Sequence, residues 1–135
     1  MRQLRRMKQT RLRPILIQPR VVTIQTPDEE HPHPEGIPEV SWGAAVSYQG
    51  EIWPATSRRQ IEQYGDRISG IQNMRIEGDY TIEIVGKTPT VVIGSSSIKP
   101  GDGVHVYAAA DADPDYVILG FTEYGPLTME IEHRV

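Results

Sequence analysis

The feature that most constrains the fold is a series of short apolar runs separated by Gly- and Pro-rich turns. Short strands between turn signals are typical of an all-β sandwich or barrel. The clearest run lies near the end of the chain, where Leu127, Met129 and Ile131 alternate with polar or charged neighbours. The sequence offers no helical segment long enough for a βαβ unit. We therefore predict an all-β fold, a small β-barrel or sandwich of about seven or eight short antiparallel strands.

Residues 98–121 predict the pair of strands that closes this barrel. Residues 99–102 (KPGD) form a turn signal, because proline presets φ and glycine supplies the positive φ that often follows. Val104 and Val106 then alternate with His105 and a tyrosine, which indicates a strand with one buried face. A second apolar run ends the segment, so we expect two antiparallel strands here.

Three local signals divide the first half of the chain. Residues 15–26 predict the first strand, and Pro19 marks its start or an edge because proline lacks an N–H donor. Residues 39–56 predict two short strands that are joined by a turn at Gly50. Ser57 is followed three residues later by glutamine, which is the capping-box pattern, so a short helical turn should begin there.

Charge is distributed unevenly along the chain. Residues 1–20 carry seven basic and no acidic residues, whereas the remaining seven basic residues accompany all 18 acids. We divide the chain into a basic N-terminal arm over residues 1–19, flexible or ordered by a partner, and a single β-barrel domain over residues 20–135. The arm is either a solvated tail or a segment that binds phosphate or an acidic protein surface. Its basic side chains that would contact a partner or DNA are Arg2, Arg5, Arg6, Lys8, Arg11 and Arg13.

Residues 27–38 (PDEEHPHPEGIP) interrupt the strand series with four prolines and four acids. This composition predicts a long, extended acidic loop within the barrel domain. A metal site at His31 and His33 is the alternative, but two histidines without a third ligand at a defined spacing favour a solvated loop.

The sequence contains no recognisable catalytic constellation. A nucleophile needs an activating base, and the base needs an orienting partner. Asp111, Asp113 and Asp115 have the spacing of a calcium loop, but the twelfth position is Thr122 and Pro114 interrupts the loop. A solvated turn is the better interpretation. We expect no enzymatic activity, no cofactor and no bound metal.

Composition adds two further expectations. The chain has no cysteine and no apolar run of the roughly 20 residues that cross a bilayer. We therefore expect no disulfide, no membrane partner and, without an apolar segment near the start, no secretory signal. Apolar residues make up only 38% of the chain, which predicts long exposed segments or burial against neighbouring subunits.

Several short motifs, taken in order, resemble the head-completion proteins of tailed bacteriophages, which are also called stopper, head-closure or head–tail joining proteins. The motifs are Val21-Val22-Thr23-Ile24 before a long loop, Trp53-Pro54-Ala55, Ser57-Arg58-Arg59, Tyr64-Gly65, Ile98-Lys99-Pro100-Gly101-Asp102, and Tyr116-Val117-Ile118-Leu119 followed by Glu123-Tyr124. The resemblance covers residues 20–134. The chain departs from the family pattern at its start, where a basic arm precedes the first strand.

The resemblance implies a structural protein of the virion, assembled in the host cytoplasm and without catalysis. It implies a homo-oligomeric ring of twelvefold symmetry in the phage neck, which lies below the portal and adaptor and closes the DNA-filled head. The ring would dock a tail-terminator or tail-completion protein, with non-specific contact to packaged DNA. Loops that would touch a neighbouring subunit or the lumen contain Glu29, Glu30, His31, His33, Ser95, Ser96 and Ser97.

Two other functions compete with this one. The first is a monomeric β-barrel that binds nucleic acid and uses the basic arm as a non-specific anchor. Its weakness is that the barrel domain is acidic and its aromatic residues are not interleaved with Lys or Arg. The second is a virion hydrolase, and the missing catalytic constellation argues against it.

Overall fold

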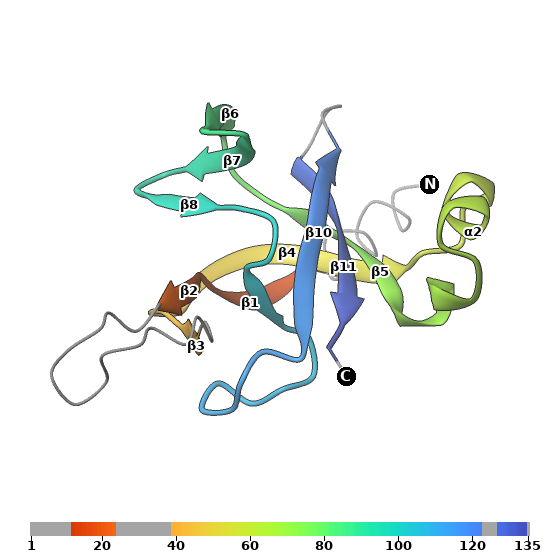
Figure 1. Ribbon diagram of the computed structural model, residues 1–135, viewed down its shortest axis with the longest axis horizontal. Helices are drawn as coiled ribbons and strands as arrows, with labels where there is room; N and C mark the ends of the chain where they lie inside the picture. Colours follow the sequence, from red (N-terminus) through yellow and green to blue (C-terminus); the bar gives the residue numbers. More distant parts are fainter. Residues whose placement is uncertain (1–11, 24–38, 123–126, 135) are drawn as a thin grey trace, which may run out of the picture.

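The structure is a computed structural model that describes residues 12–23, 39–122 and 127–134. Strands dominate this part of the chain, with one short helix, α2 (Arg58–Tyr64), and one 3-10 helix, η1 (Gly65–Gly70) (Figure 1). The strands are β1 (Arg13–Gln18), β2 (Arg20–Thr23), β3 (Glu39–Trp42), β4 (Val46–Pro54), β5 (Ile71–Ile76), β6 (Tyr80–Val85), β7 (Thr88–Ile93), β8 (Ser96–Ile98), β9 (Gly103–His105), β10 (Tyr116–Thr122) and β11 (Leu127–His133).

Six of these strands form a closed antiparallel barrel in the order β1-β4-β5-β11-β10-β9. The short strand β9 closes it, because Leu16 of β1 pairs with His105 on one side of β9 while Tyr116 of β10 pairs with Val104 on the other. The predicted all-β barrel is therefore confirmed, as is the closing role of residues 98–121. The remaining five strands form two small sheets outside the barrel, β2-β3 and β6-β7-β8.

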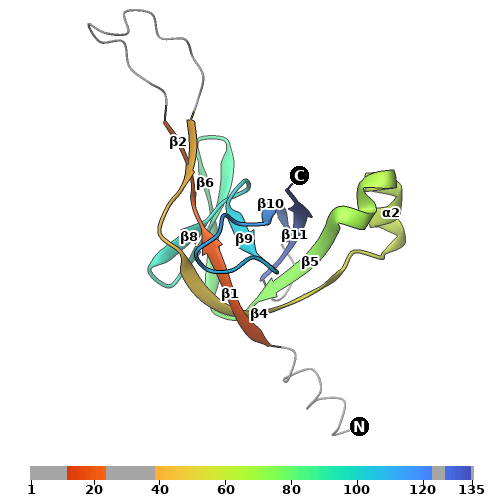
Figure 2. The same cartoon turned by 90° about the horizontal axis from the view of Figure 1, so that it is seen from below.

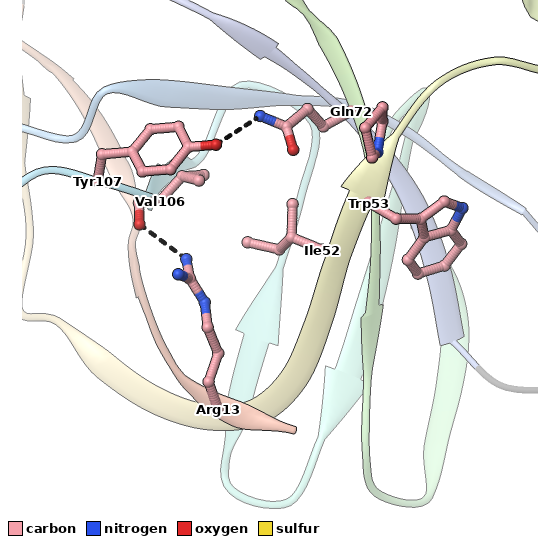
Figure 3. Close-up of a pocket in the computed structure, with 7 residues that line it drawn as sticks. Arg13, Ile52, Trp53, Gln72, Val106 and Tyr107 are labelled. Carbon is pink, nitrogen blue, oxygen red and sulfur yellow. Dashed lines mark hydrogen bonds between the residues drawn. The ribbon is translucent and has the colours of Figure 1, made fainter. Parts of the chain in front are cut away.

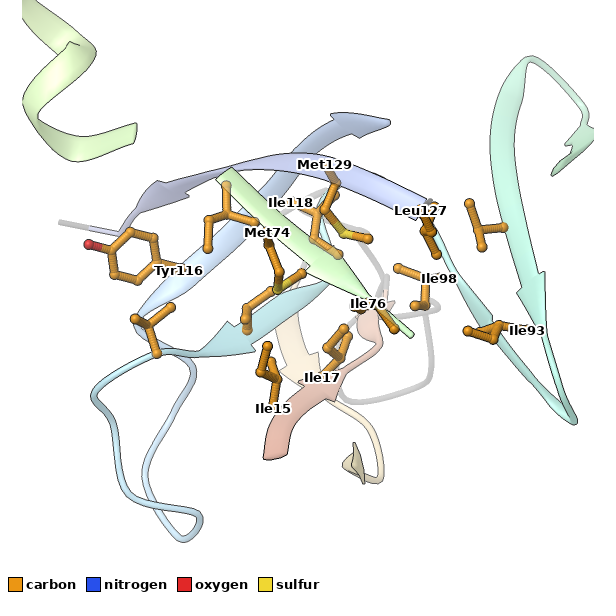
Figure 4. Close-up of a cluster of buried hydrophobic side chains, with 14 residues drawn as sticks. Ile15, Ile17, Met74, Ile76, Ile93, Ile98, Tyr116, Ile118, Leu127 and Met129 are labelled. Carbon is orange, nitrogen blue, oxygen red and sulfur yellow. The ribbon is translucent and has the colours of Figure 1, made fainter. Parts of the chain in front are cut away.

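The core lies inside the barrel and continues towards the β6-β7-β8 sheet (Figure 4). Met74 of β5 and Met129 of β11 are paired in register and fully buried. Ile93 and Ile98 extend the same cluster from the appended sheet. Each fully buried side chain of this size stabilises the fold by about 1.5–3 kcal/mol, so the apolar face of each strand decides its register.

The first barrel strand, β1, lies inside the segment that we assigned to the arm. Ile15 and Ile17 of β1 are buried in the barrel core, and Arg13 pairs with Gly50 at the start of the strand. The boundary that we placed after residue 19 is therefore wrong. The two isoleucines alternate at the period of a strand, and this apolar alternation outweighs the local excess of basic residues.

Proline and glycine also act differently from the expectation. The single strand predicted for residues 15–26 is two strands in different sheets, which break at Pro19. Gly50 is not a turn but lies inside the continuous strand β4. A side chain there would collide with the backbone oxygen of Arg75 and with Ile15, so glycine permits the close approach of β4 and β5.

The turn before β9 is organised by the carboxylate of Asp102, which is 1% exposed. It accepts backbone hydrogen bonds from Arg20 at 3.1 Å and Lys99 at 3.0 Å, and the Lys99 ammonium lies 3.2 Å away. The Asp102 backbone carbonyl in turn accepts from Ile118 of β10 at 3.0 Å. One buried residue therefore joins the start of β2, the turn and β10.

Three elements project from the barrel. The β2-β3 ribbon and the α2-η1 segment lie on opposite sides, and the β6-β7-β8 sheet forms a third projection (Figures 1 and 2).

The capping box predicted at Ser57 is confirmed, because its hydroxyl accepts from the Gln60 backbone N–H and the Gln60 side chain accepts from the Ser57 backbone N–H. Helix α2 has seven residues, which is about two turns, and η1 follows it directly and ends at Gly70.

Replacement of Asp102 by alanine tests the role of the buried carboxylate. The change leaves the backbone N–H groups of Arg20 and Lys99 without an acceptor, so we expect the free energy of unfolding to fall by about 2–4 kcal/mol. The measurement is urea unfolding followed by tryptophan fluorescence. Asp111→Ala, in an exposed loop, is the control and should change stability by less than about 0.5 kcal/mol. Equal effects of the two substitutions would contradict this account.

Candidate interaction surfaces

Most of the predicted contact residues lie outside the described part of the chain. These are Arg2, Arg5, Arg6, Lys8 and Arg11 of the arm, and Glu29, Glu30, His31 and His33 of the proline-rich segment. Arg13 and the three serines at 95–97 are described. Ser95 lies in the turn between β7 and β8, whereas Ser96 and Ser97 pair with β7 rather than forming a loop.

The α2-η1 segment is held on the barrel by polar contacts. The Gln60 side chain is 3% exposed and donates to Asn73 of β5 at 2.6 Å and to Glu130 of β11 at 2.9 Å. The Tyr64 hydroxyl donates to the same Glu130 at 3.0 Å. The anchoring face is polar, and Ile61 of α2 is 51% exposed.

Burial and the contacts with β11 raise the pKa of two side chains in this segment, Tyr64 and Arg67. Burial, together with the hydrogen bond to Glu130 and the negative charge of that carboxylate, raises the pKa of the Tyr64 phenol above its usual value. Arg67 forms a two-pronged contact with Glu132, at 2.7 and 3.0 Å, and this contact raises the pKa of the guanidinium. Both contacts fix the segment's orientation on β11.

The β6-β7-β8 sheet exposes apolar side chains at its outer end. Ile84 is 67% exposed and Val85 is 62% exposed. In contrast, Ile93 and Ile98, on the inner part of the same sheet, are buried. The sheet therefore extends beyond the surface that the barrel can cover. As successive strand residues, Ile84 and Val85 point to opposite faces, so each face of the tip exposes a branched apolar side chain that another protein chain could cover.

The β2-β3 ribbon has no buried residue. Val21 and Val22 of β2 and Val40 of β3 are each more than 40% exposed. At its base the ribbon is held by Trp42, over whose ring the Arg134 guanidinium lies at 4.9 Å. A two-stranded ribbon is marginal in isolation, so its exposed valines are also suited to contact with another chain.

A cavity of about 340 Å³ opens at the start of β1 (Figure 3). The Arg13 side chain enters it, and its Nη2 donates to the Val106 backbone oxygen at 2.8 Å. Ile52 and Val106 form an apolar wall, and the Tyr107 hydroxyl lies 3.5 Å from the Gln72 amide nitrogen at the rim. Trp53 and Pro54, at the end of β4, also line the cavity (Figure 3). The cavity therefore presents one cation above an apolar wall.

The loop between β9 and β10 is closed by structural contacts. Both carboxylate oxygens of Asp115 accept backbone hydrogen bonds, from Val106 at 2.8 Å and Tyr107 at 2.9 Å. His105 is 5% exposed, with its ring nitrogens 3.1 Å from the Ala109 oxygen and 2.7 Å from the Gln18 amide oxygen. The expectation that His105 lies on an exposed strand face is wrong, because the loop covers it.

The described residues contain no group of three or more His, Cys, Asp or Glu side chains that could hold a metal ion. Many basic side chains are also already paired. Carboxylates lie within 4.0 Å of the basic groups of Arg58, Arg59, Arg67, Arg75 and Lys99. These cations are partly neutralised, which weakens the case for a phosphate-binding groove along the described surface.

Comparison of the chain with protein-family models, curated proteins and solved structures finds no match. Among the described residues, no helix has the length and apolar character that a membrane crossing would require. The surfaces described above must therefore be interpreted from their own chemistry. Of the predicted contact residues, the structure places Arg13 in a cavity. The alternation of apolar and polar residues in the sequence could not show which distant residues would surround it.

The pKa of Tyr64 provides a test of how the α2-η1 segment is docked. Replacing Glu130 by glutamine removes the charge that favours the neutral phenol, so the pKa of Tyr64 should move towards its usual value. The measurement is absorbance at 295 nm during alkaline titration, with Tyr64→Phe subtracted to assign the transition. In the native protein, the stability contributed by Tyr64 is present below pH ~10 and is lost as the pH rises through the raised folded-state pKa. An unchanged titration in Glu130→Gln would contradict this docking.

Proposed function

We propose that this protein is a structural subunit of the neck of a tailed bacteriophage. It forms a homo-oligomeric ring below the portal and adaptor, closes the DNA-filled head and presents a surface to which the tail docks. The observation that carries the proposal is the placement of exposed apolar residues on projections from a closed barrel, at Ile84 and Val85 on one sheet and at Val21, Val22 and Val40 on the ribbon.

A closed barrel supports this function because its six strands have no free edge to pair with another chain. Strand edges that could pair with another subunit then belong to the outer sheets, where β-augmentation between subunits is possible. In a ring, one surface of each subunit contacts a different surface of the next, and projections in different directions suit this heterologous arrangement.

The order of sequence motifs adds independent support. Trp53-Pro54-Ala55 ends β4, Ser57 caps α2, and the turn at residues 99–102 introduces the strand that closes the barrel. The motifs on which the resemblance rests therefore lie at structurally defined junctions. Five paired cations on the described surface give no comparable support to a nucleic-acid module.

Sedimentation velocity of the purified protein, alone and mixed with a candidate portal–adaptor complex, tests the proposal. We expect the protein to form rings or to co-sediment with the complex. A protein that remains monomeric, never joins the complex, and binds DNA with a steep salt dependence would overturn the neck function in favour of the nucleic-acid module.

Substitution of Ile84 by aspartate tests the role of the exposed sheet. A charge in a packed interface cannot be solvated, so assembly should weaken by about tenfold or more while the barrel remains folded. The control is Thr81→Asp, which adds the same charge to an exposed polar position of β6. Sedimentation and circular dichroism are the readouts. Assembly that is unaffected by Ile84→Asp would exclude this sheet from the interface.

A further inference from the structure

The cavity at the start of β1 holds a guanidinium whose hydrogen-bonding capacity is incompletely used. Arg13 Nη2 donates to the Val106 oxygen at 2.8 Å, but Arg13 Nε is buried and has no hydrogen-bond partner. Among the described residues, no carboxylate lies within salt-bridge distance of Arg13. A buried charged donor without an acceptor is unfavourable, and a carboxylate is the group that a guanidinium fork binds best.

We propose that this cavity binds the acidic, proline-rich segment of a second copy of the chain, residues 24–38. The inference rests on the proposed function as a ring subunit and names one contact between neighbours. A carboxylate of the segment would approach Arg13 from the open side of the cavity, and an adjacent prolyl ring would pack on Ile52 and Tyr107.

The chemistry of the cavity matches this segment. Its wall is apolar at Ile52, Pro54 and Val106, and Tyr107 at the rim is 76% exposed. Residues 27–38 combine four acids with four prolines. Proline-rich segments are extended before they bind and dock readily against aromatic side chains, because little conformational entropy is lost. The basic residues 1–11 have the wrong charge for Arg13, whereas residues 24–38 have the complementary charge.

The position of the ribbon favours a contact between two copies. Thr23 and Glu39, which flank the segment, are paired at the far end of the β2-β3 ribbon. Strands β1 and β2 follow one another away from Arg13, so the ribbon carries the segment away from the cavity of its own subunit. Figure 2 shows the start of β1 at one end and the ribbon at the other.

The contact therefore joins one end of a subunit to the opposite end of the next. Such a head-to-tail contact uses two different surfaces, so every subunit can both donate its segment and receive another. Repetition of one heterologous contact produces a closed ring when the rotation between neighbours permits closure. The cavity and the segment would thus link the ring without using a barrel strand edge.

Complementary variants of the full chain test the contact. The first variant is Arg13→Gln, which removes the charge of the cavity, and the second replaces Asp28 by asparagine and Glu29, Glu30 and Glu35 by glutamine, which removes the charge of the segment. Each variant alone should lose assembly, whereas a mixture should form heterodimers and no rings, because one productive contact remains per pair. Mass photometry measures the species. Arg58→Glu, at an exposed helical position, is the control and should assemble normally. Rings formed by both variants alone would overturn the contact while leaving the neck function intact.

A peptide of residues 24–38 provides the second measurement and separates the two proposals. Its binding to the full-length protein with the neutralised segment should weaken by about tenfold when Arg13→Gln is added, and by less when Arg13→Lys is added instead. Added salt should also weaken the binding. Thermal unfolding confirms that each variant is folded. If the native chain proves monomeric but the peptide binds through Arg13, the contact stands and the ring function fails. Absence of peptide binding to the folded protein overturns the contact.

Discussion

The closure of the barrel depends on the buried carboxylate of Asp102. It accepts backbone hydrogen bonds from Arg20 and Lys99, and its own backbone carbonyl accepts from Ile118. These contacts hold the turn from which the three-residue strand β9 departs, and β9 is the strand that joins β1 to β10. Three residues provide few ladder hydrogen bonds, so the turn must position β9 accurately. Closure, in turn, places the β2-β3 ribbon at one end of the molecule and Arg13 at the other.

Once closed, the barrel leaves contact with other chains to its projections. The α2-η1 segment is attached through Gln60 and Tyr64, which are polar, and its apolar residue Ile61 is exposed. The β6-β7-β8 sheet buries its inner end and exposes Ile84 and Val85. A chain with 38% apolar residues can fill a barrel of this size, but it then retains apolar side chains on elements that the barrel does not cover. The proposed ring gives those side chains neighbours.

The alternation at Leu127, Met129 and Ile131 and the turn at residues 99–102 predicted their strands correctly, because both signals are local. The errors came from distant contacts. Gly50 is required by the approach of Arg75, and His105 is buried by a loop that ends at Asp115. Arg13 was predicted as a contact residue from charge alone, whereas its cavity is made by β4, β5 and the segment after β9. No sequence period could bring those elements together.

In the proposed ring the barrel is the scaffold, and the assembly contacts lie on its projections and at the Arg13 cavity. The most direct measurement is an electron-microscopy reconstruction of a candidate portal–adaptor complex to which the protein has been added. We expect a ring of barrels below the adaptor, with density that links the ribbon end of each subunit to the Arg13 end of the next. Portal–adaptor particles without added density, from a sample in which the protein stays monomeric, would contradict the proposed ring.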